Sequence, residues 1–502
     1  MLIHKSIEET DKKRKTNIDL RLKIKDFGPI SFGEIEIKPL TIFIGPNNSG
    51  KSYASMLIHS IFESFTSNFP KRLLLSLKRY FYHELIEYSY DAHINELMSI
   101  INEHKGKNEF QIPKHFIKNI YNGILKEIFE KRLSNEIVRS YACPLKELVR
   151  INKKNFEFEI VYDSFKIPLI FDNNEIKIKE YPNSEIKITI KLFDTKRPVI
   201  EIKENLNEIQ IELSRLFEKK RNKFIYYEIM RAIFEVCVKH IIKKITTISY
   251  YLPAARSGII QGHRALAASI VRKAPYVGIE KFEIPKFSGV VSDFISSLLE
   301  LPDEKSSFYE LAVNFEKELI KGEILVRTID EYREPEIKYK FNGAEIPLHR
   351  TSSTVSELAP LFLYLKYYLE RDNILIIEEP EAHLHPQNQL ILAKYLVRMI
   401  RKGLHIVITT HSDFLLEQIN NLILLSRIEG KRRKEKYNYD EEDYLDYNEV
   451  SAYLFEYDNI TKGHKIIRVE ITRDEGISEE EFLKVNETLY EESLKIRRDL
   501  DT

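Results

Sequence analysis

Short alternations of hydrophobic and polar residues open the chain and predict β-structure near its N-terminus. Residues 18–44 alternate strongly, which predicts two or three strands with turns at Gly28 and Gly33. The last of these strands, Leu40–Ile44, is an unbroken apolar run of the kind that is buried on both faces of a sheet. From Ser52 the spacing of apolar residues becomes helical, so a strand–loop–helix unit is expected here.

The middle of the chain changes from helical to alternating patterns and back. Residues 68–150 have mostly helical spacing, and residues 155–203 form short alternating strands that predict an antiparallel meander. A helical pattern returns over residues 206–247. Another buried strand begins near Thr246, and helices and strands follow it to about residue 428.

These patterns predict an α/β protein whose core is split by a large insertion. A length of 502 residues favours two or three domains. We expect the core in residues 1–67 and 246–428, the insertion in residues 68–245, and a small α+β appendage in residues 429–502. Within the appendage, the charged residues 429–447 are expected to form an exposed loop.

Composition and the length of the apolar runs indicate in which cellular compartment the protein is expected. Lys and Arg (77) balance Asp and Glu (77), so no overall positive field indicates nucleic-acid binding. The cysteines, Cys143 and Cys237, are far apart and fit a reducing cytosol. The N-terminus lacks an apolar signal segment, and the apolar runs are too short to cross a bilayer. We therefore expect a cytoplasmic protein without a membrane segment.

The loop after the first buried strand has the pattern of a phosphate-binding loop. It matches G-x-x-x-x-G-K-[ST] and lies between a buried strand and a helix, as that motif requires. Backbone N–H groups of such a loop surround phosphates at the positive end of the helix. Lys51 is expected to reach the β- and γ-phosphates of ATP, and Ser52 to bind Mg²⁺. The predicted nucleotide-binding residues are Gly45, Pro46, Asn47, Asn48, Ser49, Gly50, Lys51 and Ser52.

A pair of carboxylates follows another apolar strand. Ile374–Ile377 precede Glu378 and Glu379 in the stretch "ILIIEEPEAHLHP". A P-loop enzyme needs acidic groups at such a strand end to hold the metal through water and to activate the attacking water. We assign the first role to Glu378 and the second, that of general base, to Glu379. The alternative is a pair of surface carboxylates.

Two further positions could meet the γ-phosphate. The strand "IVITT" leads to His411, which could hydrogen-bond that phosphate and report its presence. Ser352 and Ser353 lie before a predicted helix, where they could donate to a γ-phosphate or only cap the helix. Both interpretations stay open at this stage.

Three other groups also allow two interpretations. Residues 378–385 contain Glu and His in a pattern that could hold a transition metal, although the carboxylate pair already explains the segment. Arg256 and Arg264 could bind phosphate or DNA, or be solvated or salt-bridged. The basic residues 431–434 are followed by the acidic residues 440–443, which favours a solvated loop over a nucleic-acid patch.

The order of these motifs resembles a known family. The P-loop, the Ser-rich signature, "EEPEAHLHP" and "TTHS" look like the ABC-type ATPase heads of the RecF, SMC and OLD (overcoming lysogenization defect) groups. The stretches "FGPI", "LTIFIGPNNSGKSY" and "IIEEPEAHLHP" resemble the OLD-like prokaryotic ATPases especially. The resemblance covers residues 20–60 and 322–428 strongly, and the insertion hardly at all.

The resemblance implies a head-to-tail dimer with two ATP molecules between the subunits. The P-loop of one subunit would face Ser352 and Ser353 of the other, and residues 381–386 would form the D-loop at the interface. The chain departs from the family pattern at Glu378, where many members have Asp, and at Thr354, where Gly is usual. OLD nucleases carry a C-terminal Toprim domain, but the residues after His411 are too few, so no nuclease domain is expected in this chain.

These features lead to one main hypothesis and two alternatives. The paired glutamates disfavour a kinase, the missing N-K-x-D motif disfavours a GTPase, and the missing membrane segment disfavours a transporter. We expect an ATPase that controls a separate effector protein, such as a nuclease, in prokaryotic anti-phage defence or DNA metabolism. The alternatives are an ATP-dependent DNA-binding clamp of the RecF or SMC kind and an ATP-gated scaffold with little turnover.

Overall fold

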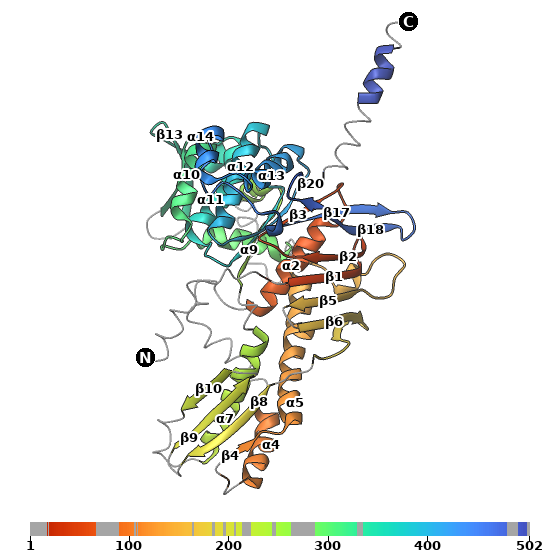
Figure 1. Cartoon of the computed structure of the whole chain (residues 1–502), viewed down its shortest axis with the longest axis vertical. Helices are drawn as coiled ribbons and strands as arrows, with labels where there is room; N and C mark the ends of the chain where they lie inside the picture. Colours follow the sequence, from red (N-terminus) through yellow and green to blue (C-terminus); the bar gives the residue numbers. More distant parts are fainter. Residues whose placement is uncertain are drawn as a thin grey trace, which may run out of the picture. The chain divides into compact units, whose positions relative to one another are not determined.

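The computed structural model (Figure 1) divides the chain into two compact units. Unit 1 comprises Met1–Lys23, Gly28–Met56 and Ser249–Thr502, and unit 2 comprises Ile24–Phe27 and Leu57–Ile248. The structure describes residues 18, 20–66, 90–104, 107, 109–162, 165–182, 186–193, 197–204, 207–212, 222–242, 247–262, 287–328, 335–478 and 490–498.

A large sheet forms the centre of unit 1, with strands in the order β11-β15-β16-β3-β17-β18-β2-β1. The five strands from β11 to β17 run parallel to their neighbours, and β17 and β18 are antiparallel. All residues of β3, β11, β15 and β16 are buried, as their unbroken apolar runs predict. The strands are β1 (Leu20–Phe27), β2 (Ile30–Glu36), β3 (Leu40–Ile44), β11 (Ser249–Leu252), β15 (Ile374–Glu378), β16 (His405–Thr409), β17 (Val450–Asp458) and β18 (Gly463–Val469).

Helices alternate with these strands along the chain, which confirms the predicted α/β class. An apolar face on α12 and on α13 supplies several of the buried core residues. The helices are α2 (Lys51–Thr66), α9 (Gly289–Leu299), α10 (Tyr309–Leu319), α11 (Ser353–Tyr367), α12 (Pro386–Arg401), α13 (Asp413–Leu425) and α14 (Gly430–Tyr437). Smaller elements are β12 (Glu323–Thr328), β13 (Pro335–Phe341), β14 (Ala344–Pro347), η6 (Leu348–Arg350), η7 (Tyr447–Glu449), β19 (Ile471–Thr472) and β20 (Gly476–Ile477).

Unit 2 contains helices and two groups of antiparallel strands. One group has the order β10-β9-β8-β4, and the other is β5-β6-β7. The helices are α4 (Tyr90–Glu103), α5 (Lys114–Leu125), the π-helix η3 (Lys126–Arg132), α6 (Leu133–Tyr141), η4 (Leu145–Leu148) and α7 (Asn222–Ile242). The strands are β4 (Glu109–Gln111), β5 (Glu157–Tyr162), β6 (Phe165–Asp172), β7 (Glu175–Ile178), β8 (Lys187–Phe193), β9 (Arg197–Glu204) and β10 (Asn207–Glu212).

Two local predictions were wrong. The expected helix over residues 206–247 begins with a strand instead, because "NEIQIE" in β10 alternates and pairs with β9. Gly33 does not form a turn, since it lies inside β2. A Cβ atom at Gly33 would lie 2.2 Å from Cβ of Ile466 in β18, so glycine permits the close approach of these strands.

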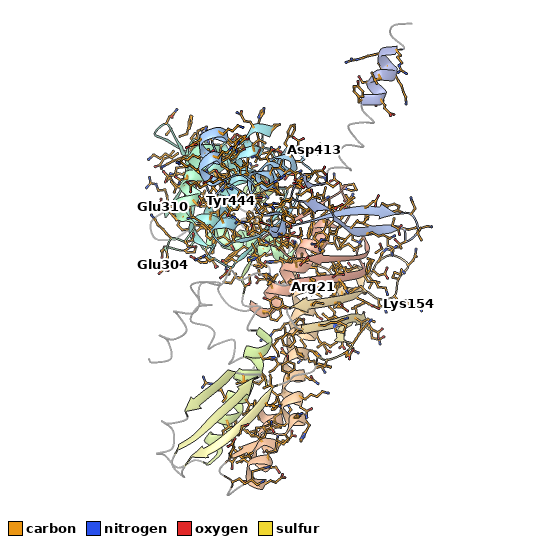
Figure 2. The ribbon with its side chains drawn as sticks, viewed as in Figure 1. Arg21, Lys154, Glu304, Glu310, Asp413 and Tyr444 are labelled. Atoms are coloured by element: carbon orange, nitrogen blue, oxygen red, sulfur yellow. The ribbon has the colours of Figure 1, made fainter. Side chains whose placement is uncertain are left out.

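In the C-terminal segment, β17 and β18 belong to the central sheet, so this part of the chain is not a separate appendage. β17 pairs along its apolar half with β3, the strand that leads into the P-loop. Residues 429–447 were expected to form an exposed loop, but they contain α14, and Arg433 and Asp443 are buried. The Arg433 guanidinium donates to the Leu425 and Glu441 carbonyl oxygens and lies 4.3 Å from the ring of Tyr444 (labelled in Figure 2). These contacts provide partners for Nη1 and Nη2 of the guanidinium, which offsets part of the cost of burying a charged residue.

Candidate active site

The P-loop leaves β3 and enters α2 with a backbone that requires its two glycines. Gly45 has φ +135°, and a Cβ atom there would lie 2.7 Å from the carbonyl oxygen of Phe455 in β17. Gly50 has φ +104°, and its Cβ would lie 2.8 Å from Cγ1 of Ile30. Side chains at either position would strain the backbone and push on neighbouring strands. The loop is therefore shaped partly by β17, a strand that lies more than 400 residues further along the chain.

Lys51, the first residue of α2, is buried against the loop. Its Nζ donates to the carbonyl oxygens of Gly45 and Pro46, each at 2.7 Å. Burial lowers the pKa of the Lys51 ammonium to about 8, and the nearby carboxylates of Glu379 and Glu378 oppose that shift. The cation thus lies at the loop, with the acidic strand end close enough to act on it electrostatically.

The rest of the loop fits a phosphate ligand. Pro46, Asn47, Asn48 and Ser52 are exposed, whereas the side chain of Ser49 is buried. The Ser49 hydroxyl has no hydrogen-bond partner among the described residues. A buried hydroxyl without a partner is costly, so a phosphate oxygen that accepts from it would remove an energetic penalty.

Glu378, the last residue of β15, is fixed by two hydrogen bonds. Its Oε1 accepts from the Tyr251 hydroxyl at 2.8 Å, and its Oε2 accepts from the Ala254 N–H at 3.0 Å. Each carboxylate oxygen keeps a further lone pair that can accept from a metal-bound water. One exposed hydroxyl, Ser52, and a buried carboxylate fit Mg²⁺, which usually keeps several waters and takes few protein ligands.

Glu379 follows β15 in an uncommon backbone conformation with φ +44°. Its N–H donates to the carbonyl oxygen of Thr409 at 3.0 Å and lies 3.2 Å from the Thr409 hydroxyl. The side chain is 44% exposed, and its Oε1 lies 4.0 Å from Nε2 of His411. Burial, and secondly Lys51, lower the pKa of His411, while Glu379 opposes the shift. The imidazole is therefore neutral at pH 7, beside a carboxylate that solvent can reach.

Glu381 connects the expected D-loop to the segment after β16. Its Oε1 accepts from the Thr410 hydroxyl at 2.6 Å and from the His411 N–H at 2.9 Å. The other oxygen, Oε2, is buried and has no hydrogen-bond partner among the described residues. Burial raises the pKa of this carboxyl group. Glu381 thus holds the backbone that carries His411.

The Ser-rich segment begins α11, and Ser352 caps this helix. The Ser352 hydroxyl accepts from the Val355 N–H at 3.4 Å, which confirms the capping interpretation for this residue. Ser352 and Ser353 are both exposed. The hydroxyl of the next residue, Thr354, donates to the carbonyl oxygen of His383 at 2.9 Å, so the signature segment contacts the expected D-loop within one subunit.

The electrostatic contacts bring Lys51, Glu378, Glu379 and His411 into one site on unit 1. No such contact links Ser352 or Ser353 to this site within the described part of the subunit.

Sequence reasoning missed the partners that hold this site. Tyr251 was not singled out; the apolar strand that contains it was visible in the sequence, but the pairing of that strand with β15, which brings Tyr251 to Glu378, was not. Arg256 is not solvated, since it is 1% exposed and forms an ion pair with Glu357 at 3.1 Å. Burial lowers the pKa of the Arg256 guanidinium, and Glu357 is the first group that opposes this shift. Arg264 lies outside the described residues.

The described residues also bear on two other points, a transition-metal site and a membrane-spanning helix. They contain no group of three or more His, Cys, Asp or Glu that could hold a metal ion. His385 instead caps α12, where Nδ1 accepts from the Gln387 N–H at 3.3 Å. No helix in the described ranges is long and apolar enough to span a bilayer.

A comparison with protein families shows the family to which the chain belongs. Residues 20–416 match the family model described as an AAA ATPase domain. The chain belongs to this ATPase family. The match confirms the ATPase recognised from the P-loop and from the carboxylates at the end of β15, and it spans both units.

Several solved structures are similar to this ATPase at low sequence identity. An SMC head bound to the C-terminal winged-helix domain of ScpA is 10% identical, covers 90% of this chain and 98% of that chain, and has a TM-score of 0.36. The SMC head domain from Thermotoga maritima is 12% identical over 91% and 100% of the chains, with a TM-score of 0.31. A Pyrococcus furiosus SMC head with an extended coiled coil is 12% identical over 94% and 99%, with a TM-score of 0.34. No curated protein matches the chain.

Proposed function

We propose that this ATPase binds and hydrolyses ATP between two head-to-tail copies of the chain and thereby controls a separate effector protein. The observation that carries the proposal is the position of Glu379. Its carboxylate is partly exposed, lies 4.0 Å from the neutral His411, and interacts electrostatically with Lys51. A carboxylate that solvent reaches beside a phosphate-binding lysine is suited to polarise an attacking water.

Each residue of the site has a role in the proposal. The backbone N–H groups of residues 45–52 and the Lys51 ammonium hold the phosphates, and Ser52 and Glu378 hold Mg²⁺, the latter through water. Mg²⁺ supplies positive charge that offsets the charge on the phosphate oxygens. Glu379 accepts a proton from the attacking water. His411 donates a hydrogen bond to the γ-phosphate, which its neutral form can do through one ring nitrogen.

The signature residues provide the reason for a dimer. Ser352 and Ser353 are exposed at the N-terminus of α11, a helix of 15 residues. Free N–H groups and the positive end of a helix attract phosphate. No hydrogen bond of these described residues reaches the P-loop of their own subunit, and a second copy can bring its nucleotide to them in a symmetric pairing.

The setting we propose is prokaryotic anti-phage defence or DNA metabolism, with the effector, such as a nuclease, carried by another chain. ATP binding would close the dimer and hydrolysis would open it, so that the effector is held in one state and released in the other. This part of the proposal is supported by the motif resemblance described above.

Steady-state ATP hydrolysis by the full chain tests the proposal, measured with Mg²⁺ and with or without duplex DNA. The control variant is Glu379→Gln, which keeps the side-chain size and removes the proton acceptor. We expect hydrolysis that Glu379→Gln lowers by about 100-fold or more and that DNA does not change. Strong stimulation by DNA would favour the DNA-clamp alternative. Equal rates for Glu379→Gln and the unmodified protein would contradict the catalytic assignment.

A further inference from the structure

Arg256 is among the most buried large side chains of the described chain, and it lies directly behind the candidate site. It follows β11 and is 1% exposed. Its guanidinium donates to the carbonyl oxygens of Pro253, Glu357, Glu378 and Glu379, so these N–H groups are not available to bind DNA or nucleotide. Burying a guanidinium is energetically costly unless its N–H groups are hydrogen-bonded, and here they donate to backbone carbonyl oxygens.

Two of these acceptors belong to the proposed catalytic residues. Nη1 of Arg256 donates to the Glu378 carbonyl oxygen at 2.7 Å, and Nη2 donates to the Glu379 carbonyl oxygen at 3.2 Å. The planar fork of arginine can span two successive carbonyl groups in this way, whereas the single ammonium of lysine cannot fix both. Glu379 has φ +44°, a conformation that non-glycine residues keep only when surrounding contacts hold it.

The opposite side of Arg256 is attached to α11. Nε donates to the Glu357 carbonyl oxygen at 3.1 Å, and the Glu357 carboxylate accepts from the backbone N–H groups of Arg256 and Ser257 at 3.1 and 2.9 Å. Glu357 is fully buried and lies in the second turn of the helix whose N-terminus carries Ser352 and Ser353.

We propose that Arg256 is a positioning residue that holds the backbone of Glu379 in its left-handed conformation by bracing it against Glu357 in the signature helix. The inference rests on the proposed function, because it gives Arg256 an effect on catalysis through Glu379. Arg256 does not touch the nucleotide. Its removal affects the chemical step more than nucleotide binding.

The test compares two buried cations that both contact α11. Arg256→Lys keeps a positive charge near Glu357 and removes the fork that spans the two carbonyl groups. The matched control is Lys366→Met, because Lys366 is also 1% exposed, lies in α11 like Glu357, and pairs with Glu316 at 2.8 Å. Both variants disturb a buried ion pair, but only the first touches the end of β15.

We expect Arg256→Lys to lower kcat by roughly 10- to 100-fold, as a displaced catalytic group does. The Kd for a non-hydrolysable ATP analogue should change by less than about threefold, since Arg256 does not reach the P-loop. Lys366→Met should keep kcat within about twofold at temperatures where thermal unfolding shows it folded. Equal loss of kcat in the two folded variants, or wild-type kcat in Arg256→Lys, would overturn the proposal.

A second variant decides the question if Arg256→Lys does not fold. Glu357→Gln keeps the side-chain size and one acceptor oxygen but weakens the brace, so kcat should fall while analogue binding is kept. Unchanged kcat in Glu357→Gln would then overturn the proposal. Assaying Glu379→Gln in parallel separates failure of the positioning role of Arg256 from failure of the proposed function. If Glu379→Gln is inactive and Arg256→Lys is fully active, only the positioning role fails; if Glu379→Gln is fully active, the proposed function fails.

Discussion

Glu379 and His411 follow neighbouring parallel strands, and their side chains approach each other, with Oε1 of the first 4.0 Å from Nε2 of the second. Because burial and Lys51 lower the pKa of His411, its imidazole is neutral at pH 7 and lies beside the Glu379 side chain. Such a pair offers a proton acceptor and a hydrogen-bond donor on the same side of the site.

Loss of the hydrogen-bond donor on His411 should slow ATP hydrolysis without preventing nucleotide binding. We expect His411→Ala to lower kcat by about 100-fold, the usual effect of removing one donor to developing charge. His411→Gln, which keeps an N–H donor, should lose less. The measurement is steady-state hydrolysis with saturating ATP. Equal kcat for His411→Ala and the unmodified protein would contradict the donor role.

The lowered pKa of Lys51 should make ATP binding depend on pH above about 8. In the free protein the Lys51 ammonium loses its proton near this pH, whereas bound phosphate favours the charged form. Binding at higher pH must therefore take up a proton, and Kd should rise by up to about tenfold per pH unit. Calorimetry between pH 7 and 9.5 in two buffers measures both effects. Lys51→Arg should show neither, and a pH-independent Kd for the unmodified protein would contradict the assignment.

Gly45→Ala should disturb the P-loop because its Cβ meets the Phe455 carbonyl oxygen at 2.7 Å and because φ is +135°. We expect a loss of about 2–3 kcal/mol in the free energy of unfolding and weaker analogue binding. The matched control is Gly343→Ala, where φ is +83° and no atom lies within 4 Å. It should lose only about 1 kcal/mol and bind normally. Urea unfolding distinguishes the two, and equal losses would exclude the contact with β17 as the cause.

Glu381 should matter through the backbone of His411. Glu381→Leu removes the acceptor of the His411 N–H and of the hydroxyl of Thr410, which is fully buried. A buried donor left unpaired costs about 1–3 kcal/mol. Kcat should fall together with stability. Glu381→Gln retains an acceptor oxygen and should stay close to the unmodified protein in both measurements. If Glu381→Leu has normal kcat in its folded state, the link to His411 has no catalytic effect.

Much of the site could be predicted because its parts are short and local. The P-loop needs only a buried strand, a glycine-bearing turn and a helix, and all three are visible between Leu40 and Thr66. The positions of Glu378 and His411 follow from apolar strands that end beside them, since carboxyl ends of parallel strands meet at one edge of a sheet.

The braces of the site could not be predicted in the same way. Arg256 and Glu357 are separated by 101 residues, and neither lies in a periodic pattern that indicates the other. β17 looked like part of a terminal appendage because periodicity predicts a strand but not its neighbour in the sheet. Likewise, the charged helix α14 packs through Arg433, whose acceptors are backbone carbonyl groups that leave no trace in the composition.

The most direct test of the central claim is a mixing experiment with two inactive variants. Lys51→Ala has an inactive P-loop and intact signature residues. Ser353→Arg has an intact P-loop and an inactive signature segment. In a head-to-tail dimer each mixed pair contains one site with both intact halves, so an equimolar mixture should recover about a quarter of the unmodified rate. A mixture that forms mixed dimers but hydrolyses no faster than either variant alone would contradict a site shared between two subunits.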